Sequence, residues 1–302
     1  MFHSLQRTLA EPVGCSGFGM HSGKEVHLTI LPARDNYGIK FFRTDLPDCP
    51  GVSAHINNVV DSSLATVIGN DGFIVSTIEH LMACFSAMGI DNAKVELDAY
   101  EMPIMDGSAA PFMSMIRSAG TTEQSCSRCY FVVKEPIELA EEGKFIGIYP
   151  ADQFQLQYTI EYDHPLIGRQ SCSIDLSDEV FETDIARART FGFLHEYEYL
   201  KQYGFARGAS LDNVVVIDND HVLNPNGLRY SDEFVRHKML DCLGDFSLLG
   251  MPILGRIVAQ KSGHAFHFNF LNTFFSRKDA WETKILSEPV QCPEARLKEL
   301  AI

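Results

Sequence analysis

The stretch SDEFVRHKMLDCLGDF, residues 231–246, predicts the long helix of this chain. Apolar side chains recur at helical spacing along one face of it: Val235, Met239, Cys242, Leu243 and Phe246. Polar side chains recur every four residues on roughly the opposite face: Glu233, His237, Asp241 and Asp245. We expect the apolar face to pack on a sheet.

The polar stripe of this helix has two interpretations. His237 and Asp241 are four residues apart, so on a helix they project from one side about 40° apart and could bind one metal ion. In that interpretation the stripe lines a cleft. A solvated acidic face is the simpler alternative, and this segment taken alone favours it.

Two other histidines have neighbours that suit chemistry at a metal. His80 follows Glu79, but the motif STIE at 76–79 also matches a capping box, in which the Glu79 side chain bonds back to the backbone. His264 follows a glycine after a predicted strand, where side chains are often presented to a cleft, although a turn histidine is the more ordinary interpretation. With the polar stripe, these residues are the parts of a metal hydrolase that keeps one coordination position open for water.

Length, composition and charge restrict the functional class. The chain has 302 residues, 45% of them hydrophobic, which is enough for two domains that each bury a core. Its formal net charge of −15 argues against a nucleic-acid partner, because phosphate contacts need a basic surface. A small phosphate-bearing ligand is still compatible with this charge if its positive contacts are local.

The sequence predicts neither a membrane span nor an export signal. No window approaches the ~20 apolar residues of a transmembrane helix, and the longest candidate, 248–259, contains Pro252 and Arg256. The first residues lack the apolar core of a signal peptide. Eight cysteines without such a signal are expected to be reduced thiols, so we expect a cytoplasmic protein.

Strands are followed by helices in both halves of the chain. The first half has strand patterns between 5 and 60 and a helix at 76–88, and the second half starts again with strands. Polar residues at 121–128 mark the predicted boundary, which divides the chain into residues 1–125 and 126–302. This pattern predicts an α+β protein of two similar sheet-plus-helix layered domains packed together.

Several motifs follow one another along the chain: GFGMHSGK (17–24), TIEHLMA (77–83), MDGSA (105–109), ARTFGF (188–193), DEFVRHKMLD (232–241) and KSGHA (261–265). In order and spacing they resemble the LpxC family, the zinc-dependent UDP-3-O-acyl-N-acetylglucosamine deacetylases of lipid A biosynthesis. The resemblance covers nearly all of the chain. Together the motifs outweigh the ordinary structural interpretation of each residue.

The resemblance implies two α+β domains with the active site between them. It implies that His80, His237 and Asp241 bind one catalytic Zn²⁺ ion, with Fe²⁺ as the alternative metal. Two imidazoles and one carboxylate leave a fourth coordination position for water. The first domain would contribute Glu79 and His80, and the second domain would contribute the remaining site residues.

The implied reaction is hydrolysis of an N-acetyl amide to acetate and a free sugar amine. By the resemblance, Glu79 is the general base, and His264 is the acid that protonates the leaving amine, which leaves poorly without that proton. Asp245 would pair with His264 and keep it charged. Thr190 would donate its hydroxyl to the developing oxyanion.

The implied substrate is a UDP-linked acylated amino sugar. Substrate-binding positions of the family match Lys238, Phe191, Lys261, Ala209 and Ser210. The segment near 193–220 matches an insert that forms an apolar passage for the acyl chain, although its apolar residues would equally suit a core.

Two positions depart from the family pattern. Ala209 stands where we expect glycine, and its extra methyl group is expected to narrow the acyl passage and change the preferred chain length. His267 stands where the family usually has asparagine, which adds a titratable group near the site.

Two other functions fit the same residues. One is a zinc amidohydrolase of this fold that acts on another N-acyl sugar, and the other is an inactive homologue that binds a nucleotide sugar. We expect a monomer. The tail that ends in Leu300-Ala301-Ile302 is either a protease recognition signal or a frayed terminus.

Overall fold

The computed structural model describes residues 3–70 and 72–286 of the chain. Within these ranges no helix is both long and apolar enough to cross a membrane. The tail at 300–302, for which a protease signal was one interpretation, lies outside the described residues.

The first half of the chain forms a five-stranded sheet in the order β2 (Val13–Phe18), β3 (Glu25–Pro32), β9 (Ala93–Leu97), β4 (Ile39–Arg43) and β5 (Gly51–Ser53). Val26, Leu28 and Ile30 of β3 are buried and alternate with more exposed residues, as the period of two in the sequence predicts. The short helix η1 (Ile56–Asn58) precedes a small sheet of β6 (Val59–Asp61), β7 (Val67–Asn70) and β8 (Phe73–Ser76). The helices of this half are α1 (Glu79–Met88) and α2 (Ala110–Ala119).

The second half forms a larger sheet around the buried strand β19 (Ile253–Gln260). On one side of β19 lie β13 (Lys144–Tyr149) and β12 (Ile137–Glu141), and β14 (Phe154–Glu161) and β15 (Arg169–Asp175) extend the sheet beyond it. Strand β11 (Cys129–Val133) pairs with the first two residues of β19, and β20 (Trp281–Ile285) pairs with β11. The helices are α5 (Glu233–Phe246), the short η3 (Ser247–Leu249) and α6 (His264–Ser276).

The two halves repeat one strand connectivity. In the first sheet β9 pairs antiparallel with β3 and parallel with β4, while β2 and β5 flank these strands in antiparallel fashion. In the second sheet β19 pairs antiparallel with β13 and parallel with β14, with β12 and β15 outside them. One helix precedes the central strand and one follows it in both halves, namely α1 and α2, and α5 and α6. The predicted α+β architecture is confirmed, and α1 and α5 occupy equivalent places in it.

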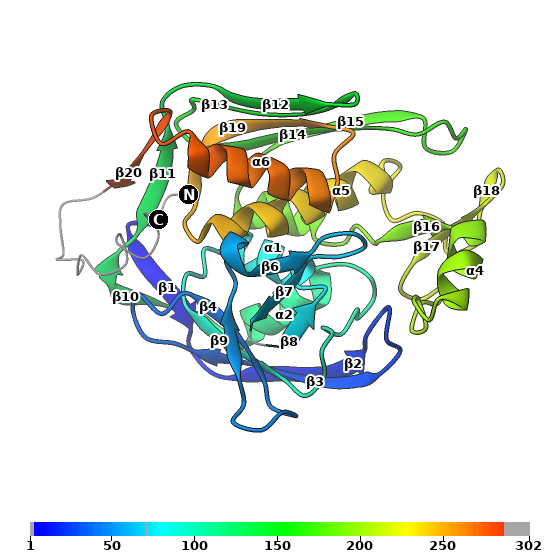
Figure 1. Ribbon diagram of the computed structural model, residues 1–302, viewed down its shortest axis with the longest axis horizontal. Coiled ribbons are helices and arrows are strands. Elements are labelled where there is room, and N and C mark those ends of the chain that lie inside the picture. Colours follow the sequence, from blue (N-terminus) through cyan, green and yellow to red (C-terminus); the bar gives the residue numbers. More distant parts are fainter. Residues whose placement is uncertain (1–2, 71, 287–302) are drawn as a thin grey trace.

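The helices form the middle of the molecule. Figure 1 shows α1, α2, α5 and α6 between the two large sheets, with α1 and α5 side by side. The polar stripe of α5 is almost completely enclosed, since Glu233 and Asp245 are 0% exposed and Asp241 is 3% exposed. The solvated-face interpretation of this stripe is therefore wrong, because α1 packs against α5 from one domain and β14 and β15 pack against it from the other.

Gly244 explains how closely α1 and α5 approach each other. A Cβ atom at this position would clash with the backbone carbonyl of Glu79, at the first residue of α1. Only glycine permits this approach, because it has no side chain to separate the two helix backbones. The close contact brings the start of α1 to the polar stripe of α5.

The predicted boundary region forms a strand. Residues 121–128 were expected to mark a domain boundary, and β10 (Thr121–Ser127) in this region pairs antiparallel with β1 (Leu5–Leu9). Paired backbone groups make a polar strand stable at this surface position. The division between 125 and 126 falls within β10 and stays a prediction.

The predicted insert near 193–220 extends from the second domain. It contains β16 (Phe191–Phe193), α4 (Leu194–Gln202), β17 (Val215–Asp218) and β18 (His221–Val222), and Figure 1 shows these elements at the right edge, away from the central helices. No side chain of α4 is buried. Before the insert lie the short helix α3 (Asp178–Val180) and the π-helix η2 (Phe181–Ile185).

Candidate active site

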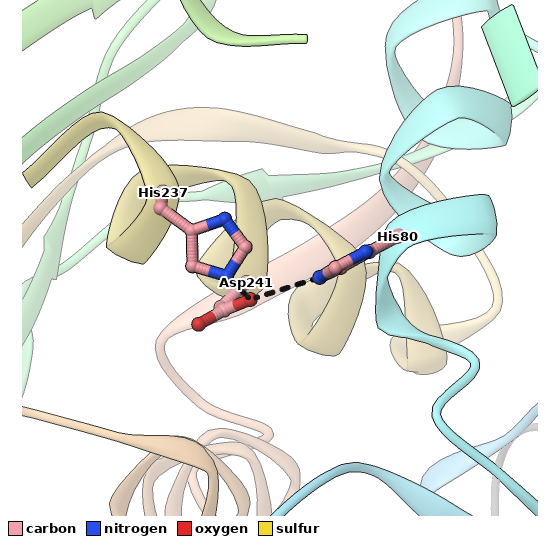
Figure 2. Close-up of side chains that lie close together, drawn as sticks. All are labelled: His80, His237 and Asp241. Atoms are coloured by element: carbon pink, nitrogen blue, oxygen red, sulfur yellow. Dashed lines mark ion pairs between the residues drawn. The ribbon is translucent and has the colours of Figure 1, made fainter. Parts of the chain in front are cut away.

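Three predicted metal ligands converge where α1 meets α5. His80 is the second residue of α1, and His237 and Asp241 lie one turn apart on α5 (Figure 2). The Oδ1 atom of Asp241 is 3.3 Å from Nε2 of His237 and 3.8 Å from Nε2 of His80. A tetrahedral ion with bonds of ~2.0–2.1 Å requires ligand atoms roughly 3.3 Å apart. The distances therefore suit one small divalent metal ion.

The protonation states of these residues also suit a metal. Burial and the neighbouring His237 lower the pKa of His80 to about 3, and burial lowers the pKa of His237. Burial alone would raise the pKa of Asp241, but His237 and the Lys238 ammonium hold it well below its ordinary range. Both imidazoles are thus neutral and the carboxylate is ionised, which is the form that binds a metal.

A buried carboxylate orients His237 through the backbone. The Nδ1–H group of His237 donates to the carbonyl oxygen of Ala188 at 3.0 Å, which directs Nε2 towards Asp241. The next residue, Arg189, donates to Glu233 from its backbone N–H and from its guanidinium, at 2.9–3.1 Å. The Glu233 side chain is 0% exposed, so this fully enclosed ion pair fixes the carbonyl that orients the ligand.

Lys238 and Phe191 lie beside the ligand cluster. The Nζ atom of Lys238 donates to Oδ2 of Asp241 at 2.6 Å and lies 5.7 Å from the centre of the Phe191 ring. Burial alone would lower the pKa of Lys238, but the Asp241 carboxylate raises it. Oδ1 of Asp241 therefore faces the imidazoles of His80 and His237, while Oδ2 accepts from the Lys238 ammonium.

Glu79 is enclosed next to the metal ligands. It is 4% exposed, and its Oε2 atom accepts a hydrogen bond from the backbone N–H of Thr66 at 3.1 Å. The capping-box interpretation is wrong, because α1 begins at Glu79 with Ile78 as its N-cap and has no side-chain cap. Burial raises the pKa of Glu79 to about 7, which is suitable for a group that takes up a proton near neutral pH.

His264 and Asp245 form the expected pair. The Nδ1 atom of His264, the first residue of α6, is 2.7 Å from Oδ2 of Asp245, and its Nε2 atom is 3.9 Å from Oδ2 of Asp241. Burial alone would lower the pKa of His264, but the charge and hydrogen bond of Asp245 raise it to about 9. For Asp245 itself, burial would raise the pKa, yet the charge and hydrogen bond of His264 lower it to about 2. His264 is therefore a cation at neutral pH.

Thr66 was missed from the sequence. Its hydroxyl donates to Oδ1 of Asp245 at 2.5 Å, while its backbone N–H donates to Glu79. Thr66 thus joins Glu79 to Asp245, the partner of His264. It lies just before β7. Nothing in the sequence around it indicates a contact with Asp245, which follows 179 residues later in the chain.

The remaining predicted site residues lie in loops of the second half of the chain. The backbone of Thr190 is fixed between two segments, since its N–H donates to Gly107 and its carbonyl accepts from Val215. The other three make their polar contacts elsewhere: Lys261 pairs with Glu161, the Ala209 N–H donates to Ala206, and the Ser210 N–H donates to Asn213. Of the substrate positions, Lys238 contacts Asp241 and Phe191 contacts the His237 ring, and the roles of all five positions stay predictions.

Comparison with known proteins places the chain in one family. The family model LpxC, described as UDP-3-O-acyl N-acetylglycosamine deacetylase, matches residues 6–276. The UDP-3-O-acyl-N-acetylglucosamine deacetylase of Myxococcus xanthus (strain DK1622) is 47% identical over 277 residues, which cover 92% of this chain and 88% of that protein. A protein of the same name from Geotalea uraniireducens (strain Rf4) is 45% identical over 299 residues, covering 96% of this chain and 97% of its own length. The expected resemblance is confirmed, and the chain belongs to the LpxC family.

Proposed function

We propose that this chain hydrolyses the N-acetyl group of UDP-3-O-acyl-N-acetylglucosamine, giving acetate and UDP-3-O-acyl-glucosamine, a step of lipid A biosynthesis. Family membership and the names of relatives that match over most of their length support this proposal. The observation that carries it is the cluster of His80, His237 and Asp241, with Glu79 and His264 beside it. A metal site flanked by one base and one acid is what amide hydrolysis requires.

We propose that the resident metal is Zn²⁺, held by His80, His237 and Asp241. When bound, it would act as a Lewis acid that lowers the pKa of a coordinated water and polarises the amide carbonyl. Two histidines and one carboxylate also suit Fe²⁺, which is the alternative to be tested. Metal analysis of the purified protein distinguishes the two.

The proton transfers in this proposal use the chain's own side chains. Glu79, with its pKa near 7, takes a proton from water as the water oxygen forms a bond to the acetyl carbon. His264, charged at neutral pH, donates its Nε2 proton to the sugar nitrogen as the C–N bond breaks. Acetic acid and a neutral amine are the products, and the acid gives its remaining proton to water to become acetate. Glu79 returns its proton to water and His264 takes one up before the next cycle.

We further propose the substrate contacts. Thr190 would donate its hydroxyl to the developing oxyanion, and Lys238 with Phe191 would bind the sugar nucleotide beside the ligand cluster. Lys261 would supply further positive charge at the nucleotide end, since its amine is well exposed. Ala209 and Ser210, in the insert at 193–220, would line the path of the acyl chain.

Acetate release from UDP-3-O-acyl-N-acetylglucosamine tests the proposal. Activity should disappear with a chelator and return with Zn²⁺. Glu79→Gln should remove activity with the metal content unchanged, because the amide oxygen can still accept from Thr66 but cannot take up a proton. UDP-N-acetylglucosamine without the acyl chain serves as the matched substrate control. Equal turnover of both substrates would favour another N-acyl sugar, and tight binding without acetate release would favour an inactive homologue.

A further inference from the structure

His267 has no role in the chemistry proposed above, yet it is in contact with it. It lies on α6 one turn after His264 and is 0% exposed. Its Nδ1 atom is 2.7 Å from Oδ2 of Asp245, the same oxygen that His264 contacts at 2.7 Å. Its Nε2 atom is 3.1 Å from the hydroxyl oxygens of both Tyr158 and Ser262.

The hydrogen-bond partners determine how His267 is protonated. Asp245 is ionised and can only accept, so Nδ1 of His267 must carry a proton and donate it. Burial lowers the pKa of His267, so the ring is neutral and Nε2 must accept. One assignment then satisfies every group: Tyr158 donates its hydroxyl proton to the backbone carbonyl of Ser262 at 2.8 Å, and the Ser262 hydroxyl donates to Nε2 of His267 at 3.1 Å.

The same atoms argue against a second metal site at this place. Asp245, His264 and His267 have the composition of a metal-binding group. Both imidazoles, however, direct Nδ1 at one carboxylate oxygen at 2.7 Å, the distance of a direct charge-assisted hydrogen bond. The three residues therefore form a hydrogen-bonded network.

We propose that His267 is a positioning residue that holds Asp245 in the orientation needed to pair with His264. The Asp245 carboxylate has three hydrogen-bond donors: Thr66 on Oδ1, and His264 and His267 on Oδ2. Of these, His264 has to change its charge during the proposed reaction, so Thr66 and His267 provide the constant contacts. His267 is itself fixed by Tyr158 and by Ser262, which immediately precedes the N-cap of α6. This inference rests on the proposed function of His264 as an acid.

His267 forms a bridge between Asp245 on one side and the hydroxyl groups of Ser262 and Tyr158 on the other. Two variants each keep one side of this bridge and remove the other. The amide of His267→Asn reaches the position of Nδ1, so it keeps a donor for Asp245 but loses Ser262 and Tyr158. The longer amide of His267→Gln reaches the position of Nε2, so it keeps the hydroxyl partners but loses Asp245. Both remove an imidazole from the same enclosed place, and each is therefore the structural control of the other.

Steady-state kinetics of the zinc-loaded protein test the inference. His267→Gln should lower kcat by roughly 10- to 100-fold, with KM and zinc content unchanged, because the orienting partner of an acid–base pair is lost. His267→Asn should keep kcat within about threefold of the original protein, whatever its thermal stability. Equal losses of kcat in both variants, or losses that follow the unfolded fraction, would show a purely structural role and overturn the inference.

NMR of ¹⁵N-histidine-labelled protein supplies a readout independent of turnover. His267, identified by the signal lost in His267→Asn, should be the neutral Nδ1–H tautomer. A charged ring or an Nε2–H tautomer would contradict the bridge. If the original protein releases no acetate while this tautomer is present, the proposed function fails and the hydrogen-bond assignment stands.

Discussion

The most informative single substitution is Asp245→Asn, because it removes a charge and changes few atoms. The pKa of His264 rises from 6.5 to about 9 in the folded protein, which corresponds to a stabilisation of the imidazolium of ~3 kcal/mol. Of the interactions that raise the pKa of His264, the charge of Asp245 is the largest, followed by the hydrogen bond to Asp245. Without that charge, burial opposes only the remaining charges of Asp241 and Glu79, and the pKa of His264 should fall towards its ordinary 6.5.

The expected loss of activity follows from the fraction of protonated acid. At pH ~8 a group with a pKa near 9 is roughly nine-tenths protonated, whereas one near 6.5 is only about 3% protonated. kcat/KM should therefore fall roughly 30-fold at this pH, and the alkaline limb of its pH profile should move to lower pH. The loss should be much smaller near pH ~6, where both forms of the site are protonated.

The assay is kcat/KM of the zinc-loaded protein between about pH 6 and 10. Asp279→Asn is the matched control, since the Asp279 side chain is 64% exposed and pairs with Arg277, outside both the site and the insert. The reasoning is refuted if Asp245→Asn lowers activity equally at every pH and leaves the alkaline limb in place. That outcome would mean that Asp245 does not set the charge of His264.

Three other changes test the packing, the base and the insert. Gly244→Ala should destabilise the protein by ~1–3 kcal/mol and weaken zinc binding, since the clash with the Glu79 carbonyl exceeds the gain of about 1 kcal/mol that alanine brings to a helix; an increase in Tm would contradict this. The pKa of Glu79, raised by burial to about 7, should appear as the acidic limb of kcat/KM, with activity rising as pH increases through it, and a limb near the ordinary 4.5 would contradict the raised pKa. Ala209→Gly should extend the range of accepted acyl chains if the Ala209 methyl narrows the passage, and an unchanged preference over substrates of graded length would contradict that role.

Local patterns predicted the helices and strands near the site well. The apolar spacing in 231–246 predicted α5, which begins at Glu233 and ends at Phe246. The predicted strand at 253–260 coincides with β19. These elements follow from periodicity, because a helix or strand buries one face and its side chains repeat with the period of the backbone.

Interpretations of single segments failed where tertiary packing determines the environment of a side chain. A solvated stripe on α5 and a capping box at Glu79 were both reasonable locally, and both are wrong because α1 and α5 enclose each other. Two similar domains were expected, but the strand connectivity that the two sheets share was not predicted, since backbone pairing preserves topology without preserving side chains. Thr66 was missed because its partner is 179 residues away in the chain.

The sequence by itself determined which residues share a helix and a face. His237 and Asp241 point the same way on any α-helix, because the backbone repeats every 3.6 residues. Only the tertiary structure decided that His80 meets them, that Glu79 and His264 have pKa values far from their ordinary ones, and that Asp245 joins Thr66 to His267. The physical reason is that these properties arise from enclosure and from contacts between distant segments, and both exist only after two helices from different halves of the chain have packed together.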